Sequence, residues 1–98
     1  MQLQIPACEA SEVTKLVGLV EGRDTRIATL TEFQHFSREL LMIAFFELAL
    51  KINGLADSER PTVLNTARAI FHRLKNQLGV DRQVLIDACE ASQGDNRN

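Results

Sequence analysis

Apolar and polar residues alternate along the chain with a helical period, and this pattern predicts four helices. The first helix is expected over about residues 7–20, because apolar residues recur there at the i, i+3, i+4, i+7 spacing of one helix face. Those residues are Val13, Leu16, Val17 and Val20. Pro6 precedes them at a position where its missing N–H costs nothing. A hairpin of residues 15–20 and 25–30 around a turn at 21–24 is the alternative, since Val and Thr are also common in strands.

The second helix is expected over about residues 30–52. Thr29 and Glu32 have the spacing of a capping box, in which the hydroxyl and the carboxylate each accept from a free backbone N–H. Asn53 and Gly54 tolerate the left-handed conformation that often ends a helix. The pattern therefore predicts a long helix with a signal at each end.

Two more helices are expected, over about residues 59–78 and about 82–91. Ser58 can cap the third helix, Pro61 is tolerated in its first turn, and Gly79 suits the position just after its end. Asp81 can cap the fourth helix. The apolar face of the third helix comprises Val63, Leu64, Ala67, Ile70, Phe71, Leu74 and Leu78, and that of the fourth Val84, Leu85, Ala88 and Cys89.

The connection between the two long helices is short, which favours antiparallel packing of the two. The predicted fold is all-α: a small helical bundle built on a long antiparallel helical hairpin of residues 30–52 and 59–78, with shorter flanking helices. Residues 1–91 are expected to form a single helical domain. Residues 92–98 contain no apolar residue and are expected to form a flexible polar tail.

The segment ELLMIAFFELAL, residues 39–50, is apolar on nearly every side. One antiparallel neighbour cannot cover such a surface, and leftover apolar patches are usually interfaces. We therefore expect a helical homodimer with an interface formed by Leu41, Met42, Phe45, Phe46 and Leu50. The alternative is a monomer in which this helix is central and is wrapped by the others.

Composition narrows the functional classes. The chain has 98 residues, a formal net charge of −2 and 45% apolar residues, which is typical of a globular domain and argues against a general polyanion binder. Cys8 and Cys89 lie near opposite ends with no CxxC spacing, so no disulfide framework or zinc site is indicated. We find no signal peptide and no apolar run of membrane-spanning length, and expect a cytoplasmic protein that contacts no membrane.

Positive charge gathers in residues 60–82, whose net charge is +4 while the remainder carries −6. The third helix has a ridge of polar residues along one side, formed by Arg68, His72, Lys75 and Asn76. The ridge suits an acidic protein surface, and it is the predicted partner-binding site. Binding to a nucleic-acid backbone through the same helix is an alternative.

The heptapeptide from His72 to Leu78, HRLKNQL, resembles the phosphoacceptor segment of one class of sensor histidine kinases. The resemblance covers seven residues, and Gly79 interrupts the helix where such kinases continue it. It implies at most a phosphotransfer protein that uses His72 and acts with a separate kinase. The competing interpretation is a solvated histidine on a basic helix.

Other chemical patterns are incomplete. Glu32 and His35, with Glu39 on the same face, have the spacing of a di-iron bundle motif, but the chain lacks the second motif. Residues 71–90 have the outline of a helix-turn-helix, yet the would-be recognition helix carries Asp87 and Glu90. We expect no catalytic residue, metal or cofactor. The sequence favours a small non-enzymatic regulatory or adaptor protein that acts through protein–protein interaction.

Overall fold

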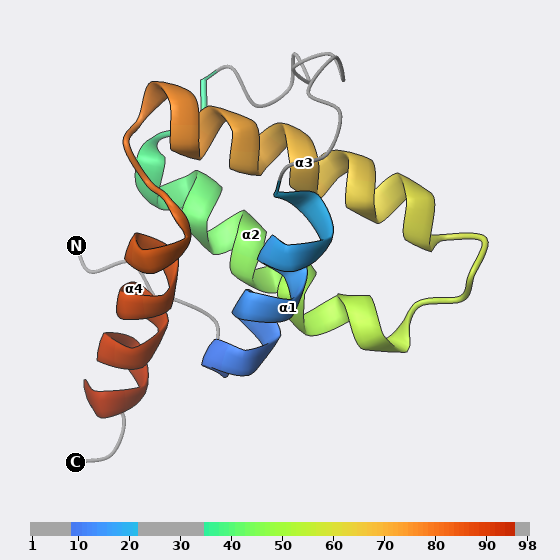
Figure 1. Cartoon of the computed structure of the whole chain (residues 1–98), viewed down its shortest axis with the longest axis horizontal. Coiled ribbons are helices and arrows are strands. Elements are labelled where there is room, and N and C mark those ends of the chain that lie inside the picture. The colour runs from blue at the N-terminus through green and yellow to red at the C-terminus, as the bar shows by residue number, and fades with distance from the viewer. Residues whose placement is uncertain (1–8, 22–34, 96–98) are drawn as a thin grey trace.

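The computed structural model describes residues 9–21 and 35–95, which form four α-helices and one 3₁₀ turn without any strand. The elements are α1 (Ala10–Val20), α2 (Arg38–Lys51), η2 (Ile52–Gly54), α3 (Arg60–Gln77) and α4 (Arg82–Asp95) (Figure 1). The prediction of a small all-α helical bundle is confirmed.

Helix α1 buries the predicted stripe completely: Val13, Leu16 and Val17 are 0% exposed. The helix begins at Ala10, and the N–H of Glu9 just before it donates to Oε1 of Glu12 at 3.1 Å. Residues 15–20 are helical, so the hairpin alternative is wrong for its first strand. Its second strand, at 25–30, and the expected helix start at Pro6 lie outside the described residues.

Helix α2 starts later than predicted. Residues 35–37 are not helical, and the hydroxyl of Ser37 accepts a hydrogen bond from the N–H of Leu40 at 3.2 Å. Serine is among the best N-cap residues, because its oxygen satisfies one of the free N–H groups of the first turn. The predicted start near 30 is therefore wrong for residues 35–37, while the Thr29 and Glu32 capping box lies outside the described residues.

The end of α2 also differs from the prediction. The helix tightens into η2, and the backbone then becomes extended at Leu55, with φ −84° and ψ 144°. Neither Asn53 nor Gly54 has a positive φ, so the left-handed cap expected there is wrong. The ammonium of Lys15 on α1 instead donates a hydrogen bond to the side-chain oxygen of Asn53. This bond ties α1 to the turn that ends α2.

Helix α3 carries Pro61 in its first turn, as predicted, but Glu59 occupies the N-cap and no side chain caps the helix there. The predicted Ser58 cap is therefore wrong. At the other end Gly79 has a φ of 70°, a conformation that side chains disfavour. The N–H of Val80 returns to the carbonyl of Leu74 at 2.7 Å, which satisfies one of the free carbonyls of the last turn.

Helix α4 begins as predicted, because Oδ1 of Asp81 accepts from the N–H of Val84 at 3.0 Å. It continues to Asp95, four residues past the expected end near Ala91. Leu85 and Cys89 are buried, and the other two predicted inward residues, Val84 and Ala88, pack against the core at its margin.

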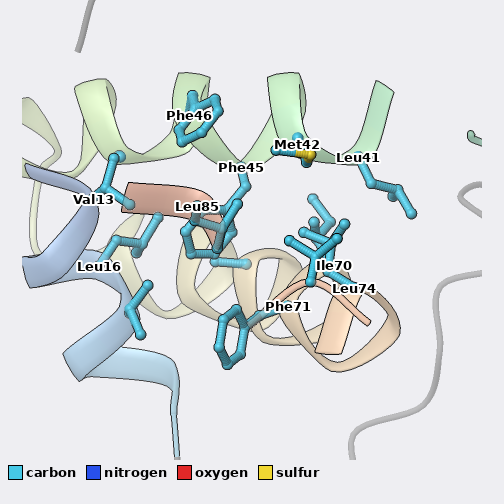
Figure 2. Packing of buried hydrophobic residues seen from close by; sticks show 14 of the residues in the cluster. Val13, Leu16, Leu41, Met42, Phe45, Phe46, Ile70, Phe71, Leu74 and Leu85 are labelled. Carbon is cyan, nitrogen blue, oxygen red and sulfur yellow. The ribbon is translucent and has the colours of Figure 1, made fainter. Parts of the chain in front are cut away.

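The core lies where α1 meets the other three helices. Helix α1 packs against α2, α3 and α4, and α2 packs against α3 (Figure 1). Figure 2 shows Phe45 of α2 projecting toward Ile70, Phe71 and Leu74 of α3, beside Leu85 of α4. No polar or charged residue is buried in the described part of the chain. The main cluster comprises Val13, Leu16, Val17, Val20, Leu41, Met42, Phe45, Phe46, Ala49, Ala67, Ile70, Phe71, Leu74, Val80, Leu85 and Cys89.

Candidate interaction surfaces

Four of the five residues predicted at a dimer interface lie inside the single chain. Leu41, Phe45 and Phe46 are 0% exposed and Met42 is 8% exposed. The expectation that they present an exposed side is therefore wrong, because α1 and α3 together cover them. The wrapped-monomer alternative expects this burial of the four residues. Leu50 differs, since 39% of it remains accessible to solvent.

The outer face of α2 stays partly apolar after folding. Leu40 is 44% exposed, and with Leu50 it completes the set of exposed large apolar residues in the described ranges. Ile43 is half-buried on the same face, and Glu47 is exposed. These four residues follow the alternating three- and four-residue spacing of a coiled-coil seam. We call Leu40, Ile43, Glu47 and Leu50 the α2 seam.

The sequence pattern missed this seam for a physical reason. Taken alone, α2 has apolar side chains on nearly every side, and its sequence does not show which of them the rest of the chain covers. The heptad-like spacing of Leu40, Ile43 and Leu50 was the available signal. The prediction instead favoured the larger Phe45 and Phe46 side chains, which the rest of the chain buries.

The predicted ridge of Arg68, His72, Lys75 and Asn76 lies on α3, and we call it the α3 ridge. Its residues differ in their exposure to solvent. Lys75 and Asn76 are exposed, whereas Arg68 and His72 are half-buried. The four residues occupy positions i, i+4, i+7 and i+8 along α3, which places them on one face of that helix. The accessible part of the ridge is the end nearer α4.

Most ridge side chains are held by neighbours along the helix. Nη1 of Arg68 donates to Oδ1 of Asn65 at 3.2 Å. The side-chain amide of Asn76 lies 2.9 Å from Nδ1 of His72, one turn earlier. Such pairs fix rotamers and leave the exposed atoms of the ridge in defined positions.

A carboxylate just after the end of α1 reaches the basic end of the ridge. Oε2 of Glu21 lies 3.9 Å from Nζ of Lys75, and its Oε1 lies 4.0 Å from Nη1 of Arg82. Both cations are about half exposed. Ion pairs this exposed contribute at most about 1 kcal/mol each. Glu21 reduces the local positive charge, and no pattern in the sequence predicted this long-range contact.

The described charges do not favour a phosphate backbone as the partner. Arg82 at the start of α4 lies close to Glu21, and Asp81, Asp87 and Glu90 are exposed just before α4 or along it. Helix α4 packs on α1, and no comparable contact joins it to α3 within the described residues, although helix-turn-helix motifs pack their two helices together.

The described residues contain no candidate metal site and no candidate membrane-spanning helix. No group of three or more metal-ligating side chains occurs among the described residues, and Glu32 of the Glu-x-x-His pattern lies outside them. Within residues 9–21 and 35–95, none of the helices combines the length and apolar character needed to cross a bilayer. Searches with models of protein families, against curated proteins and against solved structures find no match to this chain.

Proposed function

We propose that this chain is a small non-enzymatic regulatory or adaptor protein that pairs with a second copy through the α2 seam and binds an acidic protein through the α3 ridge. The observation that carries the proposal is the exposure of Leu40 and Leu50 on a helix whose other side is already buried. Exposed apolar residues at heptad spacing are typical of helix–helix association.

A second copy is the occupant we favour. Most soluble oligomers are symmetric homo-oligomers, and a two-fold axis lets one short seam serve both subunits. The seam is only about three turns long and contains Glu47, so the association is expected to be weak. Burying this carboxylate opposite apolar residues costs free energy unless a cation lies close to it.

Replacement of Glu47 tests the proposal by gain of function. Glu47→Leu makes the seam continuous and should raise the fraction of dimer measured by sedimentation at a fixed concentration. Glu90→Leu is the matched control, since Glu90 is equally charged and exposed but lies on α4. If both variants dimerise to the same extent, the gain comes from any added surface hydrophobicity, and pairing through the α2 seam is rejected.

The α3 ridge is proposed as the partner-binding surface because of its positive charge. Lys75 is exposed and lies at the end of the ridge where Arg82 adds a second cation. Basic side chains on a protein of net charge −2 steer an acidic partner toward one side of the molecule. Lys75→Glu should weaken binding of an acidic partner, and the interaction should weaken as the salt concentration rises.

Phosphotransfer through His72 is the second candidate, favoured by the contact between Asn76 and Nδ1. This contact orients the ring and leaves Nε2 as the atom available to a phosphoryl group. Nucleophilic attack requires a lone pair on Nε2 and hence a proton on Nδ1. The amide nitrogen of Asn76 is the atom that lies against Nδ1, so the side-chain amide has to turn over for its oxygen to accept from Nδ1–H. His72→Ala should then abolish phosphate uptake from a small phosphodonor while the circular dichroism spectrum stays unchanged.

A further inference from the structure

The dipeptide Asn53–Gly54 lies in an exposed turn at the end of α2. Both residues are exposed, and they form η2 together with the buried Ile52. A Cβ built on Gly54 meets nothing within 4 Å, so the space around the Gly54 backbone is open. A single 3₁₀ turn has poorer hydrogen-bond geometry than an α-helix and opens locally at small cost.

An asparagine followed by glycine can react with its own backbone. The Gly54 nitrogen, after losing its proton to hydroxide, attacks Cγ of the Asn53 amide, and the C–N bond to the side-chain nitrogen breaks. The leaving NH₂ takes a proton from water and departs as ammonia, which regenerates hydroxide, and a five-membered succinimide remains. Water then opens the ring at either carbonyl and yields aspartate or isoaspartate. Glycine permits the close approach because it has no side chain to obstruct the attack.

The structure adds a cation at the reacting atom. The ammonium of Lys15 donates to Oδ1 of Asn53, which is the oxygen that becomes negative when the nitrogen attacks Cγ. A donor aimed at the position where charge develops lowers the barrier to such acyl chemistry. The positive charge comes from α1, a helix distant in sequence, so folding creates this arrangement.

We propose that Asn53 is a site of spontaneous, Lys15-assisted deamidation. The product places a carboxylate beside the Lys15 ammonium and changes the formal net charge from −2 to −3. The isoaspartate product also adds a methylene to the backbone of η2. The new charge appears in η2, three residues beyond Leu50.

The chain contains internal controls. Asn65 and Asn76 are also exposed, but each lies within α3 and is followed by a residue with a side chain, Thr66 or Gln77. A regular helix holds the following N–H in a backbone hydrogen bond. These two asparagines should therefore react far more slowly than Asn53.

The test is ageing of the intact protein at mildly alkaline pH, with peptide mapping by mass spectrometry to follow the replacement of NH₂ by OH at each asparagine. Asn53 should be converted several-fold faster than Asn65 or Asn76. Gly54→Ala should block the reaction with an unchanged circular dichroism spectrum, because the added Cβ has room and the φ is not positive.

The role of Lys15 is tested separately. Lys15→Met should slow the conversion of Asn53 several-fold, and Lys15→Arg should restore most of the rate. The proposal is overturned if Asn53 reacts no faster than Asn65 and Asn76 in the folded protein. It is equally overturned if Lys15→Met reacts at the wild-type rate or faster, since the hydrogen bond would then only restrain the turn.

Discussion

The ring of Phe45 on α2 lies against the ring of Phe71 on α3, with centroids 5.8 Å apart and planes tilted by 34°. Both side chains are buried, and α1 packs against both helices. Aromatic pairs at this separation contribute about 0.5–1.5 kcal/mol beyond the area that they bury. The most apolar stretch of the sequence therefore serves chiefly as a core surface, and the proposed assembly surface is left to the exposed residues of α2.

Removing the Phe45 ring should strongly destabilise the fold. Phe45→Ala is expected to lower the free energy of unfolding by about 3–5 kcal/mol, because it leaves a cavity at the contact of α2 and α3. Urea unfolding followed by circular dichroism measures the change. Leu50→Ala is the control and should cost less than about 1 kcal/mol in the monomer, since Leu50 is partly exposed. Equal losses for the two variants would contradict the burial described above.

Two glycine-to-alanine substitutions should change the stability of the protein in opposite directions. Gly18 lies within α1 at an exposed position, and an added Cβ there meets nothing within 4 Å. Gly18→Ala should therefore stabilise the protein by about 0.5–1 kcal/mol. Gly79→Ala should destabilise it by about 1–2 kcal/mol, because its φ of 70° is unfavourable for residues with a side chain. Thermal unfolding of both variants measures the two changes in stability. A change in the same direction for both would be inconsistent with these backbone conformations.

The two serines near helix starts should also behave differently. Ser37→Ala removes the hydroxyl that accepts from the N–H of Leu40 and should cost about 0.5–2 kcal/mol. Ser58→Ala should change the free energy of unfolding by less than about 0.5 kcal/mol, because Ser58 does not cap α3. Chemical unfolding of both proteins gives the comparison. A larger loss for Ser58→Ala would place the cap where the sequence pattern expected it.

These serines show how far the sequence could predict the fold. Helical periodicity gave the helices and their apolar faces, because burial of one face leaves a regular mark in the sequence. The caps at the starts of α2 and α3 were not predicted, since the chain offers several capping residues close together and local preference does not choose between them. Asn53 and Gly54 carry a signal for a left-handed end, but the backbone forms η2 there and Lys15 binds the Asn53 side chain.

The interaction surfaces depended on tertiary packing and were harder to predict. The pattern could not show that α1, with only 11 residues, contacts all three other helices. It therefore assigned Phe45 and Phe46 to an assembly surface. The α3 ridge was correctly placed on one side of its helix, but the partial burial of Arg68 and the carboxylate of Glu21 beside Lys75 come from other elements.

The mass of the protein in solution, measured by light scattering over a range of concentrations, tests the proposed assembly most directly. Wild type should approach twice the mass of one chain as the concentration rises, and Leu50→Glu should remain a monomer with an unchanged circular dichroism spectrum. The second result is expected because Leu50 faces outward, so a charge there is compatible with the fold. A wild type that stays monomeric at every concentration, or a Leu50→Glu variant that dimerises as wild type does, would contradict assembly through the α2 seam.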